Sequence, residues 1–328
     1  MIISVSGFNC TGSSAVIDLL KEYDDLVVVE PEIMFVHAPD GITDLDNAIN
    51  SSGNYLSGDV AISRFKRLSK HIYLPKKIKK AFLKCVDSYI DSITLATWKG
   101  YSSYDTCRES GIRYLISRIK IFFNNVLFHC FKLHPKICYR NMRLSFKDDG
   151  FIKKTRTFLT EFEHLFSQTA KNVVFNQFFS SYCPIESMKY SEDAKLIVVT
   201  RDPRDVYITE RLHKDTICFP TETVNKYIHY YKSCCNMNSL IPLNNILYIR
   251  FEDLIYKYDE TVTRIESFLG IKKQKMVNAF FDPNVSINNT QLYLRFSQFK
   301  KDIEIIEKEL KNYLYPFPYE RVGKKNFF

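Results

Sequence analysis

The chain has 328 residues, of which 45% are hydrophobic and 25% are charged, a composition typical of folded globular proteins that argues against disorder. No stretch approaches the roughly 18 apolar residues of a membrane span. The first residues lack the basic segment of a signal peptide, so we expect a cytoplasmic protein. The nine cysteines include no CxxC pair, which favours reduced thiols over disulfides or a zinc site. No metal is expected.

The first 30 residues predict a strand, a turn, a helix and a second strand. Residues 2–5 are an apolar strand, and a turn follows to residue 12. Residues 13–23 carry apolar side chains at helical spacing, and the strand 26–29 follows at once. A strand–helix–strand unit of this length implies parallel strands.

Residues from about 54 to 170 differ in composition from the segments on either side. They are rich in Lys, Phe, Tyr and Ile and poor in Gly, and residues 79–95 and 112–131 indicate helices. We therefore expect a large helical insertion at about 54–170, within a single domain that covers residues 1–328.

The α/β pattern resumes after the insertion. Residues 195–200 (KLIVVT) are an unbroken apolar strand, typical of the interior of a parallel sheet. Asp202 then caps a helix that has Pro203 in its first turn. Further strands are expected at 172–175 and 246–249, and further helices at 221–238, 259–269 and 298–314.

The turn that joins the first strand to the first helix has the spacing of a phosphate-binding loop. It reads Gly7-Phe8-Asn9-Cys10-Thr11-Gly12-Ser13-Ser14. Glycines let such a backbone wrap an anion, and the N–H groups at the helix start point at it. An ATPase or kinase carries lysine where this chain has Ser13, so nucleoside triphosphate chemistry is disfavoured. The sequence predicts an α/β fold with a three-layer parallel sheet, a P-loop-type nucleotide turn and the helical insertion.

A second phosphate-binding pattern begins at Arg201, directly after the apolar strand 195–200. Ligands of open α/β sheets gather at such strand ends. Thr209 follows eight residues later, two turns into the expected helix. A guanidinium and a hydroxyl suit a terminal phosphate, although the same residues also fit an ordinary helix cap with surface charges.

Together the two patterns resemble the signatures of the sulfotransferase family that uses 3′-phosphoadenosine 5′-phosphosulfate (PAPS). The turn resembles the family's cradle for the 5′-phosphosulfate, and Arg201 with Thr209 resembles the pair that grips the 3′-phosphate. The residues that this resemblance assigns to the co-substrate are Asn9, Cys10, Thr11, Gly12, Ser13, Ser14, Arg201 and Thr209. Weaker matches are residues 249–254, 268–271 and 321–325. The resemblance covers residues 1–35 and 172–271, and it implies a transferase with PAPS as co-substrate.

Cys10 departs from the family pattern, which usually has Lys or Arg at this position. That cation stabilises charge on the departing sulfuryl group, so its absence leaves open a catalytically impaired nucleotide-binding protein of the same fold. A nucleotide or sugar kinase is a further alternative, which Ser13 disfavours.

Sulfuryl transfer to a hydroxyl needs a base. Glu30 and Glu32 follow the second strand, and His37 comes five residues later. A glutamate in this region is the presumed base of glycan and tyrosyl sulfotransferases, so the resemblance ranks Glu32 first, Glu30 second and His37 third. Asn176 and Gln177, at the end of another expected strand, are placed to donate hydrogen bonds to sulfuryl oxygens or to the acceptor.

The net charge of +9 is concentrated between Arg64 and Lys84, where nine basic residues occur without an acidic one. Such a segment attracts anionic membranes or acidic glycans, or is simply a solvated helix face. With the resemblance to bacterial and glycan sulfotransferases, it predicts a carbohydrate or lipid-linked glycan as acceptor and peripheral contact with the inner face of a membrane. No nucleic-acid partner is expected.

Overall fold

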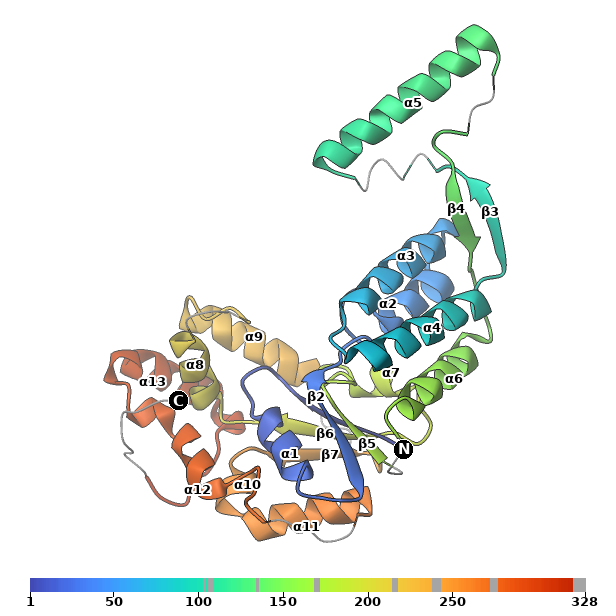
Figure 1. The fold of residues 1–328 in the computed structure, drawn as a ribbon. Coiled ribbons are helices and arrows are strands. Elements are labelled where there is room, and N and C mark those ends of the chain that lie inside the picture. The colour runs from blue at the N-terminus through green and yellow to red at the C-terminus, as the bar shows by residue number, and fades with distance from the viewer. Residues whose placement is uncertain are drawn as a thin grey trace.

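The computed structural model describes residues 1–320, except residues 103, 105–108, 134–135, 168–171, 214–217, 238–242 and 272–276. At its centre lies a sheet of five parallel strands in the order β2-β5-β1-β6-β7 (Figure 1). The strands are β1 (Ile2–Gly7), β2 (Leu26–Glu32), β5 (Asn172–Asn176), β6 (Lys195–Thr200) and β7 (Ile246–Arg250). The predicted α/β fold with a parallel sheet is confirmed.

Strand β5 lies between β1 and β2, and it pairs with both in parallel. The first strand–helix–strand unit therefore has parallel strands, as expected, but they are not neighbours in the sheet. On its other side β1 pairs with β6. As a result, the carboxyl ends of β1, β5 and β6, at Gly7, Asn176 and Thr200, meet at one edge of the sheet.

Alternate residues of the strands point to opposite faces of the sheet, and each face has its own hydrophobic core. Val173, Phe175 and Val198 pack against helices of the insertion on one face. These helices are α3 (Leu56–His71), α4 (Lys76–Ser92) and α6 (Phe151–His164). Val174 and Ile197 face the other core, which is covered by α1 (Ser13–Leu20) and α11 (Tyr258–Leu269). The molecule is thus three-layered, with the sheet in the middle.

The carboxyl-terminal half adds a third cluster of buried apolar side chains beside the sheet. Its helices are α8 (Pro203–Leu212), α9 (Val224–Met237) and α13 (Lys300–Glu309); α7 (Pro184–Met188), α10 (Asp253–Tyr256) and α12 (Pro283–Ser286) are short connections. Asp202 caps α8 by accepting a hydrogen bond from the Arg204 N–H, as predicted. The single helix expected at 298–314 is shorter, because Leu310 leaves the helical backbone conformation and 3-10 turns flank α13.

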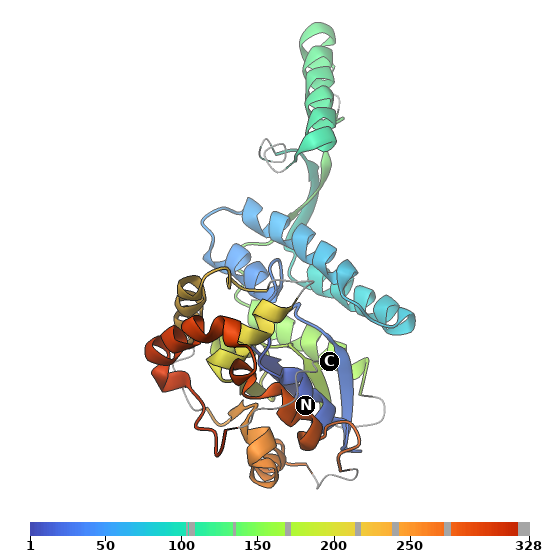
Figure 2. The ribbon, with the colours of Figure 1, turned by 90° about the vertical axis from the view of Figure 1, so that its left-hand side faces the viewer.

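The segment predicted as a helical insertion is not wholly helical, because it also carries an arm with two strands, which we define as residues 96–144. Its two antiparallel strands, β3 (Ala96–Gly100) and β4 (Arg140–Leu144), form a stalk that holds α5 (Gly111–Phe131) far from the sheet (Figures 1 and 2). Trp98, the one tryptophan of the sequence, lies on β3. The segments expected to be helical at 79–95 and 112–131 correspond to α4 and α5. None of the helices within the described ranges has the length and hydropathy to span a membrane.

A buried carboxylate anchors the stalk to α3. Asp59 is 1% exposed and accepts a hydrogen bond from the Arg143 N–H at 2.9 Å. Its other oxygen lies 2.6 Å from the Arg140 guanidinium. Buried carboxylates are costly unless they are paired in this way, so the base of the arm has a fixed place on α3. The chain before the insertion adds α2 (Ile42–Asp46), which continues into a π-helical turn.

Candidate functional site

The turn after β1 has a backbone conformation that few residues adopt. Asn9, Cys10 and Gly12 all have positive φ values, of 35°, 56° and 87°, and only glycine adopts such values without strain. A Cβ atom at Gly12 would also lie 2.4 Å from Cδ2 of Phe251. Both its conformation and its packing therefore require glycine at position 12.

Helix α1 begins directly after Gly12, and no side-chain oxygen caps its first N–H groups. The N-terminus of a helix with such N–H groups favours an anion. The other predicted residues of the turn differ in their positions. The Thr11 hydroxyl is buried and accepts from the Phe8 N–H at 3.0 Å, Ser13 Oγ accepts from Gln177 at 3.2 Å, and Asn9 is exposed.

Arg201 reaches from the end of β6 to the turn. One of its terminal nitrogens donates to the carbonyl of Cys10 at 2.7 Å, and the other to the carbonyl of Asn289 at 2.5 Å. The side chain is 6% exposed, and its guanidinium lies 5.2 Å from the ring centre of Phe251. Its Nε has no hydrogen-bond partner among the described residues. Because buried donors are rarely left without a partner, this nitrogen points to a missing ligand.

One cavity of about 530 Å³ brings the two sequence patterns together. Gly12 and Ser14 line it from the turn, Arg201 and Thr209 line it from the β6–α8 segment, and Cys10 lies between them. The Thr209 hydroxyl donates to the Asp205 carbonyl at 2.7 Å, within α8. The remaining walls come from Ala15 and Asp18 of α1, from residues 212–213 after Thr209, and from residues 251 and 278–292. Residues 321–325, which also resembled the family, lie outside the described residues.

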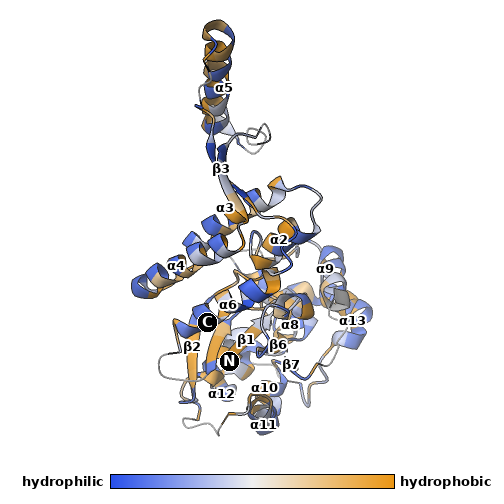
Figure 3. Ribbon diagram, turned by 90° about the vertical axis from the view of Figure 1, so that its right-hand side faces the viewer, coloured by the Kyte–Doolittle hydropathy of each residue, from blue (hydrophilic) through white to orange (hydrophobic). Residues whose placement is uncertain are grey.

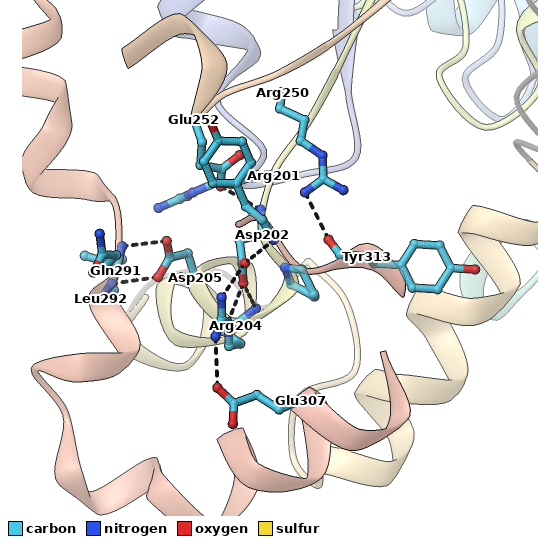
Figure 4. Close-up of polar contacts among 12 residues, drawn as sticks. Arg201, Asp202, Arg204, Asp205, Arg250, Glu252, Gln291, Leu292, Glu307 and Tyr313 are labelled. Atoms are coloured by element: carbon cyan, nitrogen blue, oxygen red, sulfur yellow. Dashed lines mark hydrogen bonds and ion pairs between the residues drawn. The ribbon is translucent and has the colours of Figure 1, made fainter. Parts of the chain in front are cut away.

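Behind Arg201 lies a cluster of buried charges that the sequence patterns did not single out (Figure 4). The Asp202 carboxylate accepts from the N–H of Arg204, from its guanidinium and from the Tyr315 N–H, at 2.8–2.9 Å. Asp205 accepts from the N–H groups of Gln291 and Leu292 at 2.8 and 2.6 Å. These bonds attach residues 291, 292 and 315 to the segment that follows Arg201.

Two acids of this cluster have raised pKa values. Burial, and secondly the negative charge of Asp202, raises the pKa of Glu252 to about 8. Burial also raises the pKa of Asp205 to about 7, although the positive charge of Arg201 opposes this. Glu252 is therefore mostly protonated at neutral pH, while one of its oxygens accepts from the Asp202 N–H at 2.7 Å.

Cys10 occupies the position where the family usually has a cation. Its thiol donates to Glu210, a carboxylate that is 2% exposed, across 3.5 Å. Burial, and secondly the charge of Glu210, raises the pKa of Cys10 to about 12. The residue is therefore a neutral thiol, which cannot supply the positive charge of the missing lysine. Glu210 was not predicted, because no local pattern joins it to the turn.

Gln177 connects the turn to the segment after β2. Its side-chain oxygen accepts from the Gly7 N–H at 3.3 Å, and its amide nitrogen donates to Ser13. Its own carbonyl oxygen lies 2.9 Å from Nε2 of His37. Since a carbonyl only accepts, Nε2 carries the hydrogen and Nδ1 is the basic nitrogen. Burial lowers the pKa of His37, so the imidazole is neutral at neutral pH.

The two glutamates of β2 lie at the same edge of the sheet, beyond Gln177. Glu30 is exposed and lies 3.0 Å from Lys21 Nζ, in an ion pair on the side of α1. Glu32 is exposed and stands opposite Asn176 in the pairing of β2 with β5. The Asn176 amide donates to the Glu30 carbonyl at 3.2 Å, and its oxygen is buried without a partner in the described part of the chain. Glu32 is thus two strands away from the turn.

A parallel sheet with a phosphate-binding type of turn after its central strand is typical of nucleotide-binding proteins, and the absence of lysine from this turn argues against an NTPase. The chain belongs to the sulfotransferase family, because the sulfotransferase domain model matches residues 125–304, more than half of its length. It is a PAPS-dependent sulfotransferase with PAPS as co-substrate, as the resemblance implied. The kinase alternative is therefore wrong. Among curated proteins, none matches the chain.

Solved structures similar to this chain include three sulfotransferases. One is the sulfotransferase domain from the curacin biosynthetic pathway, with 13% identity, a TM-score of 0.40, and coverage of 98% of this chain and 93% of that chain. The sulfotransferase domain from the olefin synthase of Synechococcus PCC 7002 has 12% identity and a TM-score of 0.42, with coverage of 97% of this chain and 95% of that chain. The sulfotransferase from Alicyclobacillus acidocaldarius has 11% identity and a TM-score of 0.36, with coverage of 94% of this chain and 95% of that chain. Similarity at this level supports no inference about the acceptor.

The cavity fits the nucleotide that the family uses. An uncapped helix start and the unpartnered Nε of Arg201 provide donors for anionic groups, and about 530 Å³ is within the range of small-molecule sites. Within the described ranges, no group of three or more His, Cys, Asp or Glu side chains is arranged to hold a metal ion.

Proposed function

We propose that the enzyme moves a sulfuryl group from PAPS to a hydroxyl, or an amine, of a carbohydrate or lipid-linked glycan. The observation that supports the nucleotide site best is the single cavity lined by both the turn and the Arg201–Thr209 pair. In this proposal the N–H groups from Gly12 to Ser14 bind the 5′-phosphosulfate, with Asn9, Cys10 and Thr11 shaping the turn. Arg201 and Thr209 bind the 3′-phosphate. PAPS itself supplies the activated sulfuryl group.

Glu32 is the proposed base that takes the proton of the acceptor. It is exposed at the carboxyl end of β2, where the acceptor can reach it. Its partner in the strand pairing, Asn176, and the neighbouring Gln177 are proposed to donate hydrogen bonds to sulfuryl oxygens or to the acceptor. Glu30 remains the second-choice base, and His37, through Nδ1, remains the third. The ion pair of Glu30 with Lys21 makes it the weaker glutamate.

An anionic acceptor, or one carried by an anionic lipid, suits the basic segment between Arg64 and Lys84. Part of its charge is neutralised, since Arg64 and Arg67 approach Asp40, and Lys66 pairs with Asp87. The exposed lysines that remain are Lys70, Lys76, Lys77, Lys80 and Lys84. We propose a bacterial enzyme that works at the cytoplasmic face of a membrane, and these lysines support its attraction to an anionic lipid surface.

The nucleotide site is tested by thermal unfolding with adenosine 3′,5′-bisphosphate, ADP and ATP. A ligand at a hundredfold excess over its Kd stabilises the folded chain by about 2.7 kcal/mol. We expect the bisphosphate to raise Tm most, and Arg201→Ala to remove its advantage over ADP. Arg211→Ala is the control, because that arginine donates to the Thr221 carbonyl instead. The proposed site would be wrong if the bisphosphate did not raise Tm, or if ADP raised Tm more than the bisphosphate does.

A catalytically impaired nucleotide-binding protein is the second candidate, and the neutral Cys10 thiol is the observation that favours it. That protein binds the bisphosphate tightly but transfers no sulfuryl group to any acceptor. If it is the correct description, Cys10→Lys supplies the missing cation and raises turnover from undetectable levels. If the wild-type chain already turns over at the rate of Cys10→Lys, this candidate is excluded.

A further inference from the structure

Helix α5 has a continuous apolar face that no other part of the described chain covers. At 100° per residue, nine of its positions form an arc of about 140° that contains no charged or amide side chain, while Ile121, Phe128 and Phe131 lie outside this arc. The nine positions are Ile112, Leu115, Ile116, Ile119, Phe122, Phe123, Val126, Leu127 and Cys130. Ile112 is 77% exposed, Phe122 63% and Leu115 59%. We call these nine residues the apolar stripe.

The opposite side of α5 faces the arm itself. A small cavity separates Ser117 and Ile121 from the returning chain at Ile137 and Tyr139. Since Ser117 and Ile121 lie across the helix from the stripe, the stripe faces away from the stalk. The stalk also holds α5 clear of the other helices (Figures 2 and 3). The stripe is therefore free to meet a large surface.

Positive charge borders the stripe on both edges. Arg113 and Lys120 follow one edge of the arc, and Arg118 follows the other. Lys132 comes directly after the helix and Lys136 follows four residues later, and residues 111–139 contain no Asp or Glu. Apolar and aromatic side chains flanked by arginine and lysine are typical of helices that lie in the interface of an anionic membrane.

We infer that α5 is a membrane-docking element, which inserts its apolar stripe into an anionic lipid surface and lies parallel to it. The helix is not apolar enough to cross a bilayer, which leaves the interfacial position. A second copy of the chain is a poorer partner for the stripe. Two stripes packed together would bring the arginines and lysines beside one stripe close to those beside the other, and no carboxylate borders the stripe to pair with them. The segment between Arg64 and Lys84 has charge but presents no comparable apolar stripe, because Phe65 and Phe82 are buried in the core and Tyr73 is its one large hydrophobic residue described as exposed.

Vesicle sedimentation of the full-length chain tests this inference. We expect it to bind vesicles of phosphatidylcholine with phosphatidylglycerol, and to bind pure phosphatidylcholine vesicles much more weakly. Phe122→Ser should weaken binding about tenfold or more, because one buried phenylalanine is lost. Asn125→Ser, an exposed position of α5 outside the stripe, is the matched control and should bind like the wild type.

The electrostatic part is tested in the same assay. Lys120→Gln should weaken binding about fivefold, whereas Lys153→Gln, an exposed lysine of α6, should leave binding unchanged. Unchanged Tm values for all four variants show that each chain is folded.

Absence of binding to anionic vesicles, or equal binding by Phe122→Ser and Asn125→Ser, would overturn the inference. So would a dimer in sedimentation equilibrium that Phe122→Ser dissociates while vesicle binding is absent, because the stripe then belongs to a second copy.

Discussion

Two regions of this molecule depart in opposite ways from the usual partition of apolar residues inside and charged residues outside. Beside the nucleotide cavity, Arg201, Asp202, Asp205 and Glu252 are buried, with at most 6% of their surface exposed. On the arm, α5 has apolar side chains that are mostly exposed, with no buried residue at all. Buried charges cost stability unless they are paired, and a large exposed apolar patch marks an interaction site or an aggregation liability.

The difference between the regions teaches how each is stabilised. The buried charges are paired by chain segments far apart in sequence, so the protein itself compensates most of their desolvation. The stripe of α5 has no such internal partner. A buried orphan nitrogen on Arg201 and an uncovered apolar face on α5 both indicate ligands outside the chain, one small and anionic, the other extended and lipidic.

The largest expected effect is a loss of turnover caused by a substitution outside the buried charge cluster. Glu32 is exposed and outside that cluster. Glu32→Gln should lower turnover by about 100-fold or more, because the carboxamide cannot take the acceptor proton, while affinity for adenosine 3′,5′-bisphosphate stays the same. Sulfuryl transfer and nucleotide titration measure the two quantities. Glu186→Gln, an exposed glutamate of α7 outside the proposed site, is the control, and unchanged turnover in Glu32→Gln would remove Glu32 from the mechanism.

The next effect is on stability, and it compares the substitution of phenylalanine by alanine in two helices, α4 and α5. Phe82 on α4 is fully buried, whereas Phe122 on α5 is 63% exposed. Phe82→Ala should lower the free energy of unfolding by about 3–5 kcal/mol, and Phe122→Ala should change it by less than about 0.5 kcal/mol. Urea denaturation measures both. A large loss in Phe122→Ala would mean that the stripe is covered in solution, which contradicts the comparison.

The smallest effect concerns the pH dependence of stability. Because the pKa of Glu252 is raised to about 8, the folded chain keeps a proton between pH 4.5 and 8 that the unfolded chain releases. The free energy of unfolding therefore falls as pH rises through this window. Glu252→Gln cannot ionise, so its decline should be shallower, by up to about 1.4 kcal/mol for each pH unit within this window.

Urea denaturation at several pH values measures this decline, with Glu186→Gln as the exposed control. Identical pH profiles for the wild type and Glu252→Gln would show that the buried acid is ionised in the folded chain.

Local patterns predicted the elements well where neighbouring residues determine them. The apolar run at 195–200 and the cap at Asp202 agree with β6 and α8. The position of β5 between β1 and β2 could not be predicted, because strand order depends on pairing between distant segments. Likewise, periodicity predicted α5 as a helix, but it does not reveal whether an apolar face is covered.

In the site, too, local sequence patterns predicted some residues and missed others. Spacing alone pointed to the turn and to Arg201 and Thr209, which the structure places on one cavity. The contact of Glu210 with Cys10 and the bonds from residues 291 and 292 to Asp205 arise from segments that meet only in the fold. No pattern within a short window carries that information.

Trp98 gives the stalk an optical property that the rest of the chain lacks. It is the one tryptophan of the sequence, 37% exposed on β3, and its strand partner is Met142. Indole emission from this protein therefore originates at a single position, between the sulfuryl-transfer fold and α5. The native chain carries its own fluorescent reporter for events at the arm, without a label or an added residue.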